Sequence, residues 1–485
     1  MEATTAWKAR GWSRKRIRLV LLAFLAGLTL FRLYYAGSIP LSEDEANYWQ
    51  WARHLDFGYY DQGPLIAWII ALGAGLLGHN ELGVRFPAVL MFLGLSLLIY
   101  DFCRQIFKNE ALGLALVVAA SGMILFSTGA IIHTYDTPQA FFWMLCLYFT
   151  GLALYTDRSW AWYGGGAAAG LAMLAKYSSV LLPVLVIVFL IVSPRHRPWL
   201  MRREPWLGAA AAVVIFSPNL VWNATHYWTA FGHTQGLAGG AWKFTTFEFL
   251  AGQMALIGPV AFVLLIIGLV LAWGRVRRGD DLQAFLLLTS LPVLFLFLLL
   301  SAKTRIFANW PGPGYLGGML AAGRALWPRM IGSSRWRNWG AAAVITGYIL
   351  TALTLFHGPV LKALKVPGES DPTVTLYGGP EVGREIGRLL DKWPGEKPFL
   401  FGLRYQKASW IAFYTPGQPR TEGLFLPVYR LNCYVFWTDP RRLQGRDGLG
   451  VIDLKSLEDP GPDFKWLFES CDRIKIFPIR GPAGT

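Results

Sequence analysis

Three consecutive acids, Glu43, Asp44 and Glu45, follow directly on the first long apolar run of the chain. Ser42 and Glu45 have the spacing of a capping box, and acids favour the first turn of a helix, so the pattern predicts a helix start. Tyr48 lies four residues after Asp44 and would share its helix face. Carboxylates and a tyrosine held together at a membrane surface also suit proton transfer, so both interpretations stay open.

These acids belong to a long aromatic loop, residues 38–81. Trp49 and Trp51 can anchor the predicted helix flat on the membrane, because amphipathic rings collect at the interface. Asp61 follows in the stretch YYDQGP, shortly before the next apolar run, and the Gly-Pro pair bends the chain there. We therefore expect a structured ledge with juxtamembrane helices rather than a flexible tether.

Polar residues also interrupt the apolar sequence at two further places. His133 and Asp136 stand in HTYDTPQ, where Asp136 as an N-cap before Pro138 would explain the pattern without any chemistry. Lys176 stands in LAKYSS, within apolar sequence. A charge at such a depth is costly, so we expect it to extend to the interface or to pair with an acid or an anionic ligand.

Two more stretches carry polar residues at the ends of apolar runs. In SPNLVWNATHYW these are Asn223 and His226, and a lone histidine there is more often a hydrogen-bonded interface residue than a ligand. In SAKTRIFANWPGPGY, Lys303 and Arg305 lie on the side of the membrane where the topology rule disfavours cations. An anion such as a phosphate would explain them.

The composition identifies the elements that hold these residues as membrane helices. Of 485 residues, 54% are hydrophobic and 15% are charged, against about 25% charged residues in soluble proteins. The net charge is +15, but the cations form short clusters between apolar runs. Such clusters encode membrane topology, whereas nucleic acid requires a continuous basic face, so we expect no nucleic-acid partner.

Eleven apolar runs are candidates for spanning a bilayer, which takes roughly 20 residues. They are residues 17–37, 82–102, 111–132, 138–155, 162–176, 178–193, 207–222, 250–273, 282–301, 314–328 and 339–357. With the N-terminus in the cytosol, every second loop is basic, in agreement with the positive-inside rule. An odd number of spans then places the C-terminal tail in the periplasm, if the membrane is a bacterial inner membrane.

The tail changes character at about residue 358 and predicts a small α/β domain, residues 358–485, after a transmembrane domain of residues 1–357. An amphipathic helix is expected at 380–392 and a strand at 398–403, with further strands at 432–439 and 472–479. Cys433 and Cys471 lie in this part and would be able to pair outside the cytosol.

The sequence contains no motif for nucleotide chemistry: there is no Walker loop, and no G-x-G-x-x-G lies between a strand and a helix. A substrate at the outer face must then carry its own activated group. A lipid-linked phosphosugar fits, because its phosphate would meet Lys or Arg and a carboxylate would deprotonate the attacking hydroxyl. The alternative is a transporter or flippase of lipid-linked sugars, which predicts charges deep in several spans or broken-helix repeats. An envelope sensor would leave loop 38–81 without a role.

Six stretches, in this order, resemble the GT-C membrane glycosyltransferases: DEANYWQWARHLDFGYYDQGPLIAW, ELGVRFPAVL, HTYDTPQAFFW, LAKYSSVLLP, SPNLVWNATHYW and ANWPGPGYL. The resemblance is to the bacterial branch related to protein O-mannosyltransferases, to the lipid A aminoarabinose transferase and to the rhizobial lipopolysaccharide galacturonosyltransferases. It covers about residues 15–330. It implies an all-α polytopic membrane protein of the GT-C type with a small α/β C-terminal extracytoplasmic domain.

The resemblance also implies a reaction, namely inverting transfer of a sugar from a polyprenyl-phosphate donor. It assigns Asp44 as the general base, Glu45 as its neighbour, and Asp136 as a residue that positions the acceptor or supports the base. The implied acceptor is a cell-envelope glycolipid, such as lipopolysaccharide core or lipid A. Protein O-glycosylation by the same fold is the alternative, and the sequence does not identify the sugar.

Relatives often have Lys or His followed by two prolines after YYD, where this chain has Gln62, Gly63 and Pro64. That difference moves the expected phosphate contacts to Lys303 and Arg305, with Lys176 behind them. The full set of expected donor- and substrate-binding residues is Lys303, Arg305, Lys176, Tyr48, Asp61, His133, Asn223, His226 and Asn309. We expect no cofactor and no metal, with Asp61 and His226 as the weak candidate ligands if one binds.

Overall fold

A computed structural model describes residues 13–232, 242–358, 362, 376–424, 431–452, 467–472 and 474–475. The chain divides into two compact units. The first comprises Met1–Tyr35, Gln62–Ile66 and Arg85–Leu355, and the second comprises Ala36–Asp61, Ala67–Val84 and Phe356–Thr485. The second unit therefore joins most of the predicted ledge to the C-terminal tail. The division into sequential domains at residue 357 stays a prediction.

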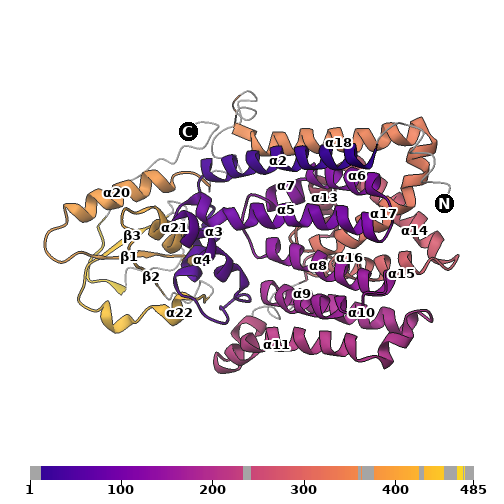
Figure 1. Cartoon of the computed structure of the whole chain (residues 1–485). Helices are drawn as coiled ribbons and strands as arrows, with labels where there is room; N and C mark the ends of the chain where they lie inside the picture. Colours follow the sequence, from indigo (N-terminus) through magenta and orange to yellow (C-terminus); the bar gives the residue numbers. More distant parts are fainter. Residues whose placement is uncertain are drawn as a thin grey trace. The chain divides into compact units, whose positions relative to one another are not determined.

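The first unit is built from helices (Figure 1). They are α2 (Arg14–Ser38), α5 (Glu81–Gln105), α6 (Glu110–Ser121), α7 (Ile124–Gly129), α8 (Asp136–Tyr155), α9 (Ala161–Ala175), η1 (Tyr177–Val180), α10 (Leu181–Val192), η2 (Arg197–Met201), α11 (Arg203–Thr225), α13 (Thr246–Ile257), α14 (Pro259–Val276), α15 (Asp281–Leu288), α16 (Leu291–Ser301), α17 (Gly312–Gly332) and α18 (Ser334–Leu355). The last residues of α2 and the first of α5 belong to the second unit.

Every predicted span coincides with helix, but three of them are broken in two. The run 250–273 forms α13 and α14, because Gly258 adopts a φ of +90° and Pro259 begins the next helix. The run 111–132 breaks between α6 and α7, and the run 282–301 breaks between α15 and α16. Among the described residues, seven helical stretches are long and apolar enough to cross a membrane. The chain is therefore a multi-pass membrane protein.

Small residues let α8, α9 and α11 pack closely. A Cβ atom on Gly166 of α9 would overlap the carbonyl oxygen of Gly208 on α11, so neither position has room for a side chain. Helix backbones in membranes approach this closely only across small residues. α9 also packs along α8, which contributes the fully buried Trp143 to the apolar core. This packing fixes Asp136, at the start of α8, relative to Lys176, at the end of α9.

The second unit contains a three-stranded parallel sheet in the order β2-β1-β3. The strands are β1 (Phe399–Gly402), β2 (Thr421–Gly423) and β3 (Gly448–Val451), and Leu400 of the central strand pairs with both Thr421 and Leu449. The helices are α3 (Glu43–Arg53), α4 (Leu65–Leu77), α20 (Gly379–Asp391), α21 (Tyr405–Tyr414) and α22 (Tyr434–Trp437). Helix α21 packs against β1 on one side and against α3 on another.

The tail confirms some of the predicted elements and corrects others. The helix expected at 380–392 is α20, and the strand expected at 398–403 is β1. The strand expected at 432–439 is wrong, because these residues form the single helical turn α22. Aromatic residues favour strands, but one helical turn brings the rings of Tyr434 and Trp437 to 5.4 Å and buries Tyr434 among polar partners. The segment 472–479 lies mostly outside the described residues.

The cysteines of the tail do not pair. Cys433 and Cys471 are both free thiols in the structure. Cys433 is buried and its sulfur accepts a hydrogen bond from the backbone N–H of Tyr60, whereas Cys471 is exposed. The fold class is as expected, an all-α polytopic membrane protein with a small α/β part at the C-terminal end.

Candidate active site

The first turn of α3 carries the three acids, and the predicted capping box is present. The hydroxyl of Ser42 accepts a hydrogen bond from the backbone N–H of Glu45 at 3.2 Å. In return, the carboxylate of Glu45 accepts from the backbone N–H of Ser42 at 3.0 Å and from its hydroxyl at 3.1 Å. Glu45 is fully buried. Its carboxylate therefore fixes the start of the helix, and its expected catalytic contribution stays a prediction.

The carboxylate of Glu43 is held by a lysine from the tail. The ammonium nitrogen of Lys407, in α21, lies 2.6 Å from Oε1 of Glu43 and 4.9 Å from the ring centroid of Trp410. Lys407 is 9% exposed, so the ion pair is largely removed from water. Lys407 is not among the site residues predicted from the sequence. The available signal was a cation within the aromatic stretch RYQKASW.

Asp44 differs from both neighbours because it is exposed. Glu43 is half-buried and pairs with Lys407, and Glu45 is fully buried and bonds to Ser42. Tyr48 was expected to share a helix face with Asp44 and to contact the substrate. It is buried against Trp51, with ring centroids 5.2 Å apart, so little of its side chain is exposed to a substrate.

The sequence predicted that the tryptophans of α3 anchor the helix on the membrane surface. The structure shows that this prediction is wrong. Trp49 and Trp51 are 0% and 1% exposed. Trp49 packs edge-on against Phe413 of α21, and Trp51 stacks on Tyr59 at 4.4 Å. The helix is therefore embedded in the second unit, and its aromatic side faces the tail instead of lipid.

A polar network completes the contact between α3 and the tail. The amide of Gln50 donates to the hydroxyls of Thr421 and Tyr434, each at 3.2 Å. The hydroxyl of Ser409 in α21 lies 3.4 Å from the side-chain oxygen of Asn47 and 3.2 Å from Tyr434 Oη. Burial raises the pKa of Tyr434, so its hydroxyl stays protonated as a donor. These bonds orient α3 and hence the acids at its start.

In the first unit, three of the predicted site residues meet at one point. Lys176 Nζ lies 2.7 Å from Oδ1 of Asp136, and the amide nitrogen of Asn309 donates to Oδ2 of Asp136 at 2.6 Å. The three residues come from the start of α8, the end of α9 and the segment before α17. Asp136 is the first residue of α8 and makes no N-cap bond, so the capping alternative is wrong. Its carboxylate is used for this cluster instead.

Aromatic rings surround the ammonium group of Lys176. The ring centroids of Tyr135 and Trp310 lie 4.9 Å and 5.6 Å from Nζ, which favours a cation at that position. Lys176 is 7% exposed and His133 is fully buried. The contact with Asp136 confirms the expected pairing of Lys176 with an acid. His133 was expected to bind substrate, but its buried side chain has no exposed surface.

Asn223 and His226 lie near the end of α11, and their contacts are mainly internal. Asn223 is fully buried and donates to the backbone oxygen of Asn219 at 2.9 Å, with Tyr177 Oη at 3.4 Å. His226 stacks on Trp222 with ring centroids 4.0 Å apart, and its Nδ1 lies 2.8 Å from the backbone oxygen of Trp222. These contacts of the two residues are thus with their own helix and with Tyr177, and direct substrate contact stays a prediction.

Lys303 and Arg305 lie on an exposed loop of the first unit. Arg305 pairs with Glu248 at 3.2 Å, and both side chains are more than half exposed. Lys303 lies 5.9 Å from the ring centroid of Trp242, which is 80% exposed. Backbone hydrogen bonds from residues 243 and 245 to residues 303 and 301 hold the loop in place. An exposed ion pair of this kind is worth at most about 1 kcal/mol, so Glu248 holds Arg305 only weakly.

Asp61 and His226 are the weak candidates for metal ligands. Asp61 belongs to the second unit and His226 to the first. Within the described residues, no group of three or more His, Cys, Asp or Glu side chains has the arrangement of a metal site. That the reaction needs no metal remains a prediction.

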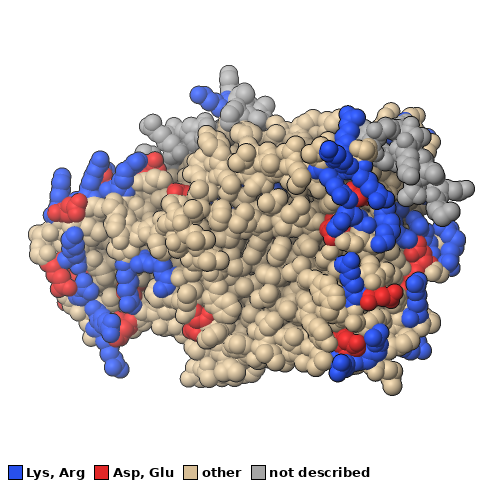
Figure 2. All heavy atoms as spheres, in the orientation of Figure 1, with Lys and Arg blue, Asp and Glu red and all other residues tan. Residues whose placement is uncertain are grey.

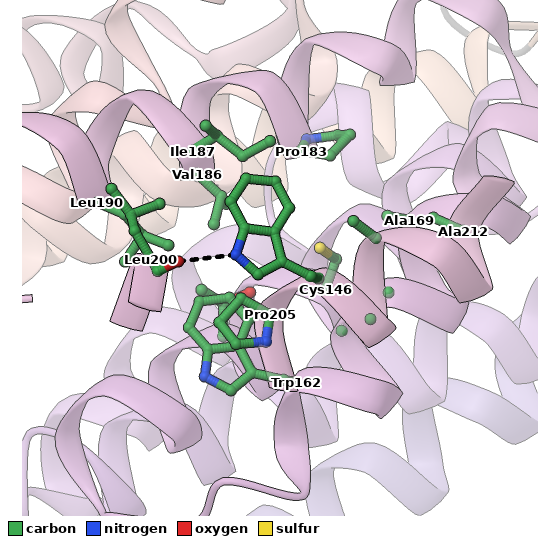
Figure 3. A pocket seen from close by; sticks show the side chains of 16 residues that line it. Cys146, Trp162, Ala169, Pro183, Val186, Ile187, Leu190, Leu200, Pro205 and Ala212 are labelled. Carbon is green, nitrogen blue, oxygen red and sulfur yellow. Dashed lines mark hydrogen bonds between the residues drawn. The ribbon is translucent and has the colours of Figure 1, made fainter. Parts of the chain in front are cut away.

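The first unit also contains an apolar pocket (Figure 3). Its walls come from α8, α9, α10 and α11 and include Cys146, Trp162, Val186 and Pro205. Trp162 precedes Lys176 by 14 positions on α9, which corresponds to about 21 Å along a helix. The walls are almost entirely apolar, so this pocket does not suit a sugar or a phosphate.

Comparison with known proteins gives matches over most of the chain. Residues 61–222 match the family described as dolichyl-phosphate-mannose-protein mannosyltransferase. The lipid A galacturonosyltransferase RgtD of Rhizobium johnstonii is 28% identical, over 76% of this chain and 77% of its own. The undecaprenyl phosphate-alpha-4-amino-4-deoxy-L-arabinose arabinosyl transferase of Pectobacterium carotovorum subsp. carotovorum is 23% identical, over 73% of this chain and 68% of its own.

Solved structures have the same fold. The crystal structure of ArnT from Cupriavidus metallidurans in the apo state matches with a TM-score of 0.64 at 16% identity, over 94% of this chain and 92% of that one. The same protein bound to undecaprenyl phosphate matches with a TM-score of 0.62 at 15% identity, over 90% of each chain. The likeness in fold thus extends from the membrane helices into the tail.

Proposed function

This chain is a membrane glycosyltransferase of the GT-C fold, and we propose that it moves a sugar from a polyprenyl-phosphate donor to lipid A or lipopolysaccharide core, with Asp44 as the general base. The observation that carries the assignment of Asp44 is its exposure. Glu43 is half-buried beside Lys407 and Glu45 is fully buried in the capping box, whereas Asp44 is the exposed acid of this turn.

In the proposed reaction, Asp44 takes the proton of an acceptor hydroxyl as the oxygen attacks C1 of the donor sugar. A new bond forms between C1 and the acceptor oxygen while the bond between C1 and the phosphate oxygen breaks. The electron pair leaves with the polyprenyl phosphate, and attack from the opposite face inverts C1. The donor supplies the activation, so no nucleotide is needed.

The neighbouring residues would hold Asp44 in the position that the reaction needs. Lys407 and Ser42 hold the two flanking carboxylates in fixed positions. A base on a helix whose first turn is capped and whose aromatic side is packed loses little freedom on binding substrate. Glu43, Glu45 and Lys407 act as positioning residues in this proposal.

The Asp136 cluster would bind or position substrate rather than act as a base. Both oxygens of Asp136 already accept strong hydrogen bonds, from Lys176 and from Asn309. With both oxygens occupied, Asp136 has no oxygen open to an attacking hydroxyl. The donor phosphate is proposed to contact Lys303 and Arg305, with Lys176 behind them.

The relatives support a glycolipid acceptor. The names of the two relatives given above refer to transfer of galacturonic acid to lipid A and to transfer of aminoarabinose from undecaprenyl phosphate. Protein O-glycosylation remains the alternative, and the description of the matching family is its support. A flippase is not favoured, because the clustered polar residues of the first unit lie at helix ends.

The decisive test is sugar transfer by Asp44→Asn. Purified protein with a polyprenyl-phosphate sugar and lipid A should show transfer reduced at least about 100-fold, with binding of polyprenyl phosphate unchanged. Asp56→Asn is the matched control, since Asp56 is an exposed acid of the same unit. An Asp44→Asn enzyme with normal turnover would rule out Asp44 as the base.

The acceptor can be identified independently of the mechanism. Mass spectrometry of envelope glycolipids and glycoproteins from a deletion strain should show one species that has lost one sugar relative to the parent. We expect lipid A or lipopolysaccharide core. Loss from a protein instead would establish the alternative.

A further inference from the structure

A polar pocket opens between the C-terminal ends of α14 and α17. Its lining comprises the charged residues Arg275, Arg278, Asp280 and Arg329 together with the apolar or small residues Val270, Leu271, Gly274, Gly279, Ala325 and Pro328. Asp280 Oδ2 lies 3.2 Å from Arg275 Nε and 2.6 Å from Nη1 of Arg324. One acid therefore pairs with two arginines at the edge of this pocket and leaves a net positive charge there.

The pocket carries an excess of positive charge. Arg278 and Arg329 are exposed and make no side-chain hydrogen bond or ion pair within the described part of the chain. Three lining arginines against one lining acid leave a charge of +2. Figure 2 shows Lys and Arg side chains gathered at this end of the helical unit. Arginines grouped in this way suit a phosphate, which they bind with paired N–H donors.

The pocket is distinct from the candidate active site. Helix α17 begins three residues after Asn309, and Arg329 lies in its last turn. About 20 residues at about 1.5 Å each separate these two positions by roughly 30 Å, the thickness of a bilayer core. The pocket and the Asp136 cluster therefore lie at opposite ends of the membrane helices.

An apolar stripe leads from this pocket along α14. Val263, Ile266, Val270 and Trp273 are 51%, 47%, 66% and 54% exposed. Their spacing of three, four and three residues places them on one helix face, and Val270 also lines the pocket. A free phosphate would use only the arginines, whereas a phospholipid would use the arginines and the stripe together.

We propose that this pocket binds the headgroup of an anionic phospholipid, with an acyl chain along the Val263–Trp273 stripe. Cations beside membrane helices bind anionic lipid with about 1 kcal/mol for each charge. The bound lipid would join α14 to α17 at the face opposite the chemistry. The site has no part in the sugar-transfer reaction.

The test uses the full-length protein in a neutral detergent, titrated with phosphatidylglycerol or phosphatidylcholine and observed by native mass spectrometry. We expect phosphatidylglycerol to bind at least tenfold more tightly. The double substitution Arg278→Ala and Arg329→Ala should weaken that binding roughly 30-fold, about fivefold for each charge. Replacement of both by Lys should restore most of it.

Two controls separate a built site from general surface charge. The double substitution Arg195→Ala and Arg203→Ala removes two exposed cations outside the pocket and should leave binding unchanged. An equal loss in this control would overturn the proposal, as would equal binding of phosphatidylcholine. Inorganic phosphate that displaces the phospholipid at a similar concentration would identify a plain anion site. Transfer activity plays no part in the readout, so the result is independent of the proposed reaction.

Discussion

The ammonium nitrogen of Lys407 lies 2.6 Å from Oε1 of Glu43, so a residue of the C-terminal tail holds the first turn of the helix that carries Asp44. The two side chains are 11% and 22% exposed. The tail is therefore part of the structure around the proposed base.

Lys407→Met should destabilise the second unit and lower transfer, because it leaves Glu43 with an unpaired charge in a mostly buried position. We expect a loss of about 2–4 kcal/mol, measured by thermal unfolding in detergent. Adding Glu43→Gln should recover part of that loss, since the uncompensated carboxylate is then removed. Equal stability of wild type and Lys407→Met would contradict a structural ion pair.

Breaking the contact between Lys176 and Asp136 should affect both stability and transfer. Lys176→Met and Asp136→Asn are each expected to cost about 2–3 kcal/mol. The double variant should cost less than the sum, because the two groups are in contact. Stability would then be partly recovered while transfer stays low. Additive losses would show that the 2.7 Å contact contributes nothing.

Arg305→Ala and Lys303→Ala should weaken binding of polyprenyl phosphate if these cations contact the phosphate. Loss of one charge-assisted hydrogen bond is worth about 1.5–3 kcal/mol, or roughly 10- to 150-fold in affinity. Lys243→Ala is the matched control, because Lys243 is an exposed cation on the segment that is hydrogen-bonded to Lys303. Unchanged affinity in all three variants would contradict a phosphate contact by Lys303 or Arg305. Lys176 would then be the remaining candidate for that contact.

The second unit should lose stability in mild acid through His54. Burial lowers the pKa of His54 below 6.5, and Arg53 and Arg420 oppose its protonation further. The unfolded chain binds this proton first as the pH falls below 6.5, so the stability of the folded form decreases there and is unaffected above it. His54→Gln should flatten the pH dependence of the melting temperature between pH 7 and 5. If the melting temperature depended on pH equally in wild type and His54→Gln, the loss of stability in acid would come from groups other than His54.

The orientation of the tail can be tested with a native residue. Cys471 is the exposed one of the four cysteines, and the other three are buried. An impermeant thiol reagent should therefore label intact spheroplasts at Cys471, if the tail is periplasmic as the loop charges predict. Cys471→Ser should abolish that labelling. Protection of Cys471 in spheroplasts, with labelling after lysis, would reverse the predicted topology.

Local patterns in the sequence predicted the helices and the unusual charges, because these depend on short stretches of chain. The capping box at Ser42 and Glu45 is such a pattern, and it is present as predicted. Lys176 was identified by its cost in apolar sequence, and its pairing with an acid followed from the same argument. The sequence did not predict which acid pairs with Lys176, because Asp136 is 40 residues away in the chain.

The environment of a side chain was harder to predict. Trp49 was expected to face lipid, but Phe413 covers it, and a sequence does not distinguish apolar contact with protein from apolar contact with lipid. Lys407 was missed for a related reason, since its partner is Glu43, far away in the chain. The break at Gly258 was predictable but was missed, because Gly258 and Pro259 form the same Gly-Pro signal that marks the bend at residues 63–64.

The hydrogen bond between Gln50 and Tyr434 joins residues 384 positions apart. During synthesis at about 5–20 residues per second, helix α3 therefore leaves the ribosome roughly 20–80 s before its partners exist. The acidic helix cannot reach its final environment until residue 434 has been synthesised. A chain truncated before that residue would carry Asp44 without the contacts that orient it, so we expect activity to require the tail as well as the membrane helices.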